Sequence, residues 1–200
     1  MLAKILLVVA GLVVVFVAVV ATRPSAYHVE RNLEVAAPPD LVFGVLNDLR
    51  QFAGVLVLFG TPWEETDPGM QKTFEGPATG VGQSYAWDSK KEVGRGRMTI
   101  EESVPARKVG IKLEFVAPMK STATFAFTLA EAPSGTLVTW SMDGNHNFLG
   151  KAFGLFMNMD KMLGADIEKG LARLKTAAES PRSAATAAAA PAGADTPAAP

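Results

Sequence analysis

Thr136–Gly144 reads TLVTWSMDG, and Phe148–Glu179 reads FLGKAFGLFMNMDKMLGADIEKGLARLKTAAE; together these two segments decide the fold. In the first, apolar and polar residues alternate, which is typical of a strand with one buried face. In the second, apolar residues recur at steps of three and four, which predicts one long amphipathic helix. The helix needs an apolar surface to cover, so we expect it to lie across a sheet that contains the strand.

Further strand-like segments precede this pair at hairpin spacing. They are Gln71–Glu75, Gln83–Asp88, Glu92–Glu102, Lys108–Phe115 and Thr122–Leu129, with short turns rich in Gly, Pro and Ser between them. Tyr27–Val35 is expected to form the first strand, and a short helix from Asp40 to about Leu49 follows Pro38-Pro39. Connections this short favour antiparallel pairing. The order predicts an α+β fold, an antiparallel sheet with helices on one face.

The amino-terminal segment Ile5–Ala21 contains no charge and no proline. As a helix with Met1–Ala3 it would reach the thickness of a hydrocarbon core, about 30 Å. A cleaved signal peptide with Lys4 as its basic end is the alternative, but the apolar run exceeds the usual length of such a region. We therefore expect a single-pass membrane protein. Lys4 on one side nearly balances Arg23 and Arg31 on the other, so the side on which the domain lies is not indicated.

The chain divides into three parts by composition. Residues 1–22 are the expected transmembrane anchor, and residues 23–180 form one domain of ordinary composition. Residues 181–200 are rich in alanine and proline, cannot build a core, and are expected to be disordered.

Charge and cysteine content exclude several classes of function. The chain has 19 Lys+Arg against 20 Asp+Glu, so it lacks the basic excess that nucleic-acid binding requires. It has no cysteine and only two histidines, which argues against zinc and iron–sulfur sites. We expect no metal and no cofactor. The oligomeric state is not indicated.

Several short motifs resemble one known family. They are Val35–Phe43 (VAAPPDLVF), Asp48-Leu49-Arg50, Val138–Gly144 (VTWSMDG), Asn147-Phe148, Gly154–Met159 (GLFMNM), Asp160-Lys161-Met162 and Glu168–Leu171 (EKGL). In these residues and in the order of its elements the chain resembles the START-like superfamily, also called SRPBCC, in its polyketide cyclase/dehydrase branch. The resemblance covers roughly residues 27–179. It implies a helix-grip fold, in which a curved antiparallel sheet surrounds the C-terminal helix and an apolar cavity.

The residues expected to line that cavity come from the inward faces of the strands and from the last helix. Leu113, Phe127 and Trp140 fall on predicted inward faces, and Tyr85 and Trp87 add polar groups that could hold one end of a ligand. The candidate ligand-binding residues are Tyr85, Trp87, Leu113, Phe127, Trp140, Phe156 and Met159. A filled core would place the same apolar residues inside, and the pattern does not separate the two cases.

Signals for catalysis are weak. His146 could act as a general base, although a turn before the last helix explains the loop Asp143–Asn147 equally well. The adjacent Glu101 and Glu102 point to opposite faces of a strand, and no nucleophile motif is present. The sequence therefore favours a membrane-anchored carrier for an apolar small molecule or lipid. A cyclase/dehydrase-type enzyme and a ligand-free interaction module remain as alternatives.

The first half of the predicted last helix is apolar on nearly all sides, with Leu149, Phe153, Phe156, Met157 and Met162 outside the main stripe. A helix of this kind must be covered. We expect the apolar run Val55–Phe59 to cover it, or both segments to form a cavity entrance near the membrane.

Overall fold

A seven-stranded antiparallel sheet forms the centre of the domain, in the order β1-β9-β8-β7-β6-β5-β4. The computed structural model describes residues 1–58, 60–91, 93–156 and 158–180. The strands are β1 (Ala26–Val35), β4 (Gln71–Glu75), β5 (Ser84–Asp88), β6 (Arg95–Val104), β7 (Lys108–Ala117), β8 (Ser121–Ala132) and β9 (Gly135–Asn145). The predicted α+β fold is confirmed, and each predicted strand segment contains a strand, although β6 begins at Arg95 and Glu92, the predicted start, lies outside the described residues.

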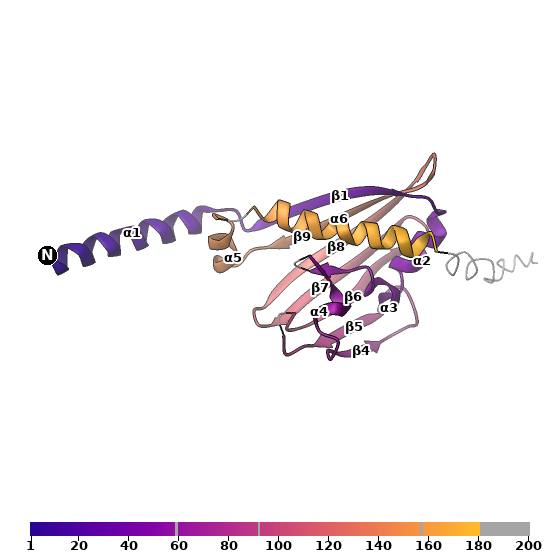
Figure 1. Ribbon diagram of the computed structural model, residues 1–200, viewed down its shortest axis with the longest axis horizontal. Coiled ribbons are helices and arrows are strands. Elements are labelled where there is room, and N and C mark those ends of the chain that lie inside the picture. Colours follow the sequence, from indigo (N-terminus) through magenta and orange to yellow (C-terminus); the bar gives the residue numbers. More distant parts are fainter. Residues whose placement is uncertain (59, 92, 157, 181–200) are drawn as a thin grey trace, which may run out of the picture.

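The helix α6 (Met159–Ala178) lies across one face of this sheet and runs beside β1 (Figure 1). Ile167, Leu171 and Leu174 are buried on its inner face. At Gly170 the helix approaches the sheet so closely that a Cβ atom would overlap the ring of Trp140. Arg31 of β1 fixes the start of the helix, because its guanidinium donates to Asp160 at 3.1 Å and to Glu168 at 2.9 Å. The resulting arrangement is the helix-grip fold.

The last helix is not continuous, so the prediction of one helix from Phe148 to Glu179 is wrong. A short helix, α5 (Phe148–Phe153), is followed by a turn, and α6 begins afterwards. The side chain of Asn158 accepts a hydrogen bond from the backbone N–H of Lys161 at 3.0 Å, which makes Asn158 the N-cap of a new helix. Gly154 also lowers the helix propensity at the break. As a result α5 leaves the sheet and lies at one end of the domain (Figure 1).

Between β1 and β4 the chain forms small elements that cover the open side of the sheet. They are α2 (Pro39–Leu46), α3 (Leu49–Phe52), a two-stranded hairpin of β2 (Val57–Leu58) and β3 (Thr61–Pro62), and α4 (Trp63–Thr66). The expected helix from Asp40 to Leu49 ends early, because the side chain of Asp48 accepts from the N–H of Arg50 and caps α3. Buried Gln83 holds α3 in place, since its side-chain oxygen accepts from the N–H of Leu49 at 2.7 Å.

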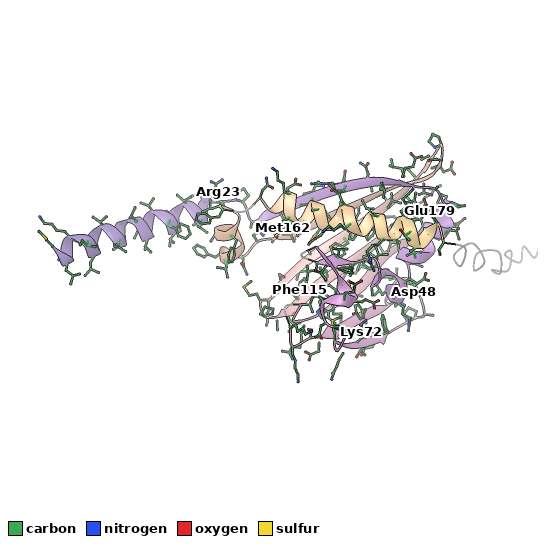
Figure 2. All side chains as sticks on the ribbon, in the orientation of Figure 1. Arg23, Asp48, Lys72, Phe115, Met162 and Glu179 are labelled. Carbon is green, nitrogen blue, oxygen red and sulfur yellow. The ribbon has the colours of Figure 1, made fainter. Side chains whose placement is uncertain are left out.

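The N-terminal helix α1 (Leu2–Thr22) extends away from the domain (Figure 1), and its side chains project freely along most of its length (Figure 2). It is long and apolar enough to cross a membrane, a property that signal sequences share. Val20, in its last turn, is fully buried, whereas the large apolar side chains before it are exposed. The helix α5 contacts α1, so the end of α1 is packed against the domain. The tail predicted to be disordered, residues 181–200, lies outside the described residues.

Candidate ligand-binding site

An apolar cavity of about 70 Å³ lies between α6, the β2–β3 hairpin and the inner face of strands β7 to β9. The hairpin and α4 form one wall, the sheet forms the floor, and α6 closes the remaining side. The lining residues are Leu56, Val57, Leu58, Trp63, Leu113, Phe115, Phe125, Trp140, Met142, Leu163, Asp166 and Ile167. Such a wall suits an apolar ligand.

The cavity is small for a ligand site. Pockets for drug-sized ligands occupy about 300–1,000 Å³, several times the space present here. The alternating inward side chains of β8 and β9 fill most of the interior, and Phe125, Phe127 and Trp140 are all buried. A larger ligand therefore requires one wall to move. The hairpin is the wall most able to move, because it has two strands whereas the sheet has seven.

Trp140 brings a polar group into this apolar interior. Its indole is 2% exposed and packs against Phe52, Phe125 and Phe127, with ring centroids 5.9, 5.5 and 4.7 Å away. Within the described part of the chain, its Nε1 is the one buried side-chain nitrogen or oxygen without a hydrogen-bond partner. A buried donor without an acceptor costs about 1–3 kcal/mol. An acceptor oxygen brought by a ligand would remove that cost.

The hairpin is fastened to α6 by hydrogen bonds to its backbone. The N–H of Gly60 donates to the carboxylate of Asp166 at 2.7 Å, and the ammonium of Lys169 donates to the carbonyl of Gly60 at 3.4 Å. Just before the hairpin begins, the carbonyl of Gly54 accepts a hydrogen bond from Nε of Arg173 at 2.7 Å. These three charged residues are spaced along one face of α6. The helix therefore holds both the turn of the hairpin and the chain that leads into it.

The structure brings together some of the residues proposed for the site. Leu113 and Trp140 line the cavity, and Phe127 lies directly behind Trp140. Tyr85 and Trp87 lie deeper in the core, and their polar groups bond within the protein. The hydroxyl of Tyr85 accepts from Nε1 of Trp63 at 3.2 Å, and Nε1 of Trp87 donates to the carbonyl of Val93 at 3.2 Å.

The other proposed site residues lie elsewhere. Phe156 is 80% exposed and lines a separate crevice beside the end of α1. His146 lines the same crevice, where its ring stacks on Tyr27 with centroids 4.4 Å apart. Partial burial lowers the pKa of His146. The backbone of Met159 begins α6, but its side chain lies outside what the structure describes.

Of the described residues that line the cavity, Leu113 and Trp140 alone are among the candidates named from the sequence, and Trp63 and Asp166 are the two missed residues that bring polar groups. Trp63 falls in a stretch without periodicity, so nothing in the pattern assigns it a face. Asp166 could have been identified from the sequence. It follows Leu163 by three positions and precedes Gly170 by four, and this spacing places a carboxylate beside the apolar stripe of the helix.

The apolar run from Val55 was expected to cover the first half of the last helix; it meets Leu163 in the cavity wall, but it does not cover α5. Leu56 and Val57 are buried beside α6, within the cavity wall, and Phe153 of α5 is 53% exposed. Because the chain breaks before α6, the hairpin covers α6 and leaves α5 uncovered. Phe59 and Met157, which also belonged to the expected contact, lie outside the described residues.

Comparison with solved structures shows the same fold in several proteins. A protein from Chromobacterium violaceum superposes with a TM-score of 0.53 at 14% identity, over 76% of this chain and 97% of that one. The di-domain ARO/CYC StfQ from the steffimycin biosynthetic pathway gives a TM-score of 0.53 at 16% identity, over 78% of this chain and 51% of that one. Ara h 8.0201 gives a TM-score of 0.50 at 13% identity, over 76% of this chain and 95% of that one.

A comparison with curated proteins finds no match. The profile of one protein family, described as polyketide cyclase / dehydrase and lipid transport, matches residues 26–179, from the first strand of the sheet to the end of the helix that crosses it. The match spans the whole helix-grip domain, so the chain belongs to the polyketide cyclase/dehydrase and lipid transport family.

Proposed function

We propose that this protein is a membrane-anchored binding or carrier protein that holds an apolar small molecule or lipid beneath α6. The observation that carries the proposal is the apolar cavity that contains Trp140, whose indole N–H has no partner in the described structure. A ligand with a long apolar part and one acceptor oxygen, such as a fatty acyl ester, would match both features.

The ligand would enter by displacing the β2–β3 hairpin. That hairpin is short and lies outside the seven-stranded sheet, and side chains of α6 fasten it through hydrogen bonds to backbone groups of the hairpin segment. Opening it exposes Leu56 and Val57 without disturbing the strands. In the closed state the cavity stays small and the apolar wall is kept from water.

The anchor in this proposal is α1, retained in the mature protein. Its support is the burial of Val20 in the last turn of α1, where the helix contacts α5. Cleavage near Thr22 would remove that packing. We accordingly propose the division into an anchor (residues 1–22), a START-like domain (residues 23–180) and a tail (residues 181–200).

Binding without chemistry is preferred to catalysis. His146, the one base that the sequence suggested, lines the crevice near α1 and does not line the cavity. Among the described residues of the cavity wall, Asp166 is the one with an ionisable side chain, and its carboxylate accepts the N–H of Gly60. A general base must reach the proton that it removes, and this carboxylate is engaged in holding the hairpin.

Native mass spectrometry of the full chain, released from detergent, tests the proposal. We expect a retained adduct of lipid size that dissociates on activation. The variant Leu163→Trp, which fills the cavity from α6, should lose the adduct, whereas Leu137→Trp, at an exposed position on β9, should keep it. Folded protein without any adduct, even after incubation with a lipid extract, would contradict a carrier role.

A further inference from the structure

An exposed apolar surface lies on the segment from α5 to the turn before α6. Four large side chains form it, and we call them the α5 surface: Phe148, Leu149, Phe153 and Phe156, exposed by 50%, 45%, 53% and 80%. Among the described residues outside α1, every exposed phenylalanine belongs to this surface. The other exposed large apolar residues are single valines, a methionine and a leucine on separate turns and strands. Four such groups within nine residues need a partner.

The position of the surface indicates the partner. The helix α5 contacts α1, and it lies beside the end of α1 that joins the domain (Figure 1). If α1 spans the bilayer, its C-terminal turn lies at the level where hydrocarbon meets headgroups. The α5 surface then lies at the same level. Segments that lie in the membrane interface bury Trp, Phe and Leu side chains at that depth.

The charges beside the surface fit the same location. A crevice of about 510 Å³ opens between the end of α1, the start of β1 and α5, and its described lining includes two basic side chains, Arg23 and Lys151. Figure 2 labels Arg23 at the junction of α1 with the domain. Both charges are positive, and none of the described residues that line the crevice has a carboxylate side chain. Phosphate groups of lipids are the negative charges at this depth, and a basic rim around an apolar face is typical of interfacial segments.

We infer that the α5 surface inserts into the lipid interface beside α1 and gives the domain a second contact with the bilayer. This inference rests on the proposed anchor, because α1 sets the depth of α5. Two contacts fix the tilt of the domain, whereas a single helix followed by a short connection would leave it free to rotate. The partner is the lipid surface itself and not a second protein chain.

The absence of cysteine from the chain allows a direct test. Single-cysteine variants of the full chain, each carrying a nitroxide label, are reconstituted into vesicles of phosphatidylcholine and phosphatidylglycerol. Phe153→Cys and Phe156→Cys report the α5 surface. Leu137→Cys, exposed near the start of β9, is the matched aqueous control, and Val13→Cys, exposed in the middle of α1, reports the anchor. Relaxation by oxygen, which concentrates in lipid, is compared with relaxation by a water-soluble nickel complex.

We expect oxygen to relax the labels at 13, 153 and 156 more strongly than the nickel complex does, and the reverse at 137. Aqueous labels at 153 and 156 with a lipid-exposed label at 13 would overturn the inference and leave the anchor intact. An aqueous label at 13 would overturn the anchor itself and this inference with it. Spin–spin broadening at 156 that disappears on dilution with unlabelled protein would show that a second copy covers the surface, which would also overturn the inference.

Discussion

Removal of the Asp166 carboxylate should open the cavity. In the structure this group accepts a hydrogen bond of 2.7 Å from the N–H of Gly60, and Asp166 is 8% exposed. A hydrogen bond to a charged group contributes about 1.5–3 kcal/mol. Loss of that contribution in Asp166→Ala should raise the equilibrium constant for hairpin opening by about 10- to 140-fold, since 1.4 kcal/mol corresponds to a factor of ten. The burial of Leu56 and Val57 remains, so the hairpin stays mostly closed.

Two measurements on the full chain in detergent detect the change in hairpin opening. The amide of Trp63 donates to the carbonyl of Leu56 at 2.9 Å across the base of the hairpin, so its hydrogen-exchange rate reports opening directly. Stopped-flow mixing with an apolar fluorescent dye reports entry into the cavity. We expect both rates to rise by a similar factor in Asp166→Ala.

Asp166→Asn is the matched control, because an amide oxygen can still accept from Gly60 but carries no charge. It should lie between the wild type and Asp166→Ala in both measurements. If Asp166→Ala speeds exchange of the Trp63 amide but leaves dye entry unchanged, the hairpin is not the entrance. If neither rate changes, Asp166 does not hold the hairpin closed and the reasoning fails.

Three further predictions follow from single residues. Trp140→Phe removes the unpartnered N–H together with part of the buried ring, so its free energy of unfolding, measured by chemical denaturation, should stay within about 1 kcal/mol of the wild-type value. Trp140→Ala should lose about 3–5 kcal/mol. A loss in Trp140→Phe as large as that in Trp140→Ala would show that the N–H has a partner in solution. Gly170→Ala should lower the free energy of unfolding by about 1 kcal/mol although alanine favours helix, because its Cβ would overlap Trp140; a stabilised variant would mean that α6 shifts at no cost. The hydrogen bond to Asp143 raises the pKa of His28, and burial lowers the pKa of His146, so proton NMR should show two histidine titrations on opposite sides of about 6.5. The contribution of His28 to stability is then present below pH 6.5 and is lost as pH rises through its folded pKa. The contribution of His146 is instead lost as pH falls below 6.5. Two histidines that titrate with the same pKa would argue against both environments.

The strands and the position of the main helix were predictable because each follows from a local period. In Thr136–Gly144 the alternation assigns Val138, Trp140 and Met142 to one face, and the structure places all three on the inner face of the sheet. The turns between strands contain Gly and Pro, so pairing of neighbours required no long-range information. Strands β4 to β9 lie in the sheet in their order along the chain. Only β1 pairs with a strand distant in sequence, β9, at the edge of the sheet.

The candidate site was less predictable because it depends on contacts that no period encodes. The apolar run from Val55 could be a strand, a loop or part of the core; its pairing with β3 makes it a hairpin, and side chains of α6 hold that hairpin over the cavity. The break before α6 depends on two residues, Gly154 at the end of α5 and Asn158 as the N-cap of α6, within an otherwise helical pattern. The apolar stripe continued through that point, so the pattern favoured one helix.

The connection between α1 and β1 consists of residues 23–25 alone, which reach at most about 14 Å when extended. If α1 is the proposed anchor and the domain the proposed carrier, so short a tether would hold the cavity at an effective concentration relative to its own bilayer that does not depend on how much protein is present. Its exchange with that bilayer should therefore be first order in protein and insensitive to dilution. Delivery to a second membrane would require that membrane to come within the length of one domain, so such transfer would be confined to places where two bilayers are closely apposed.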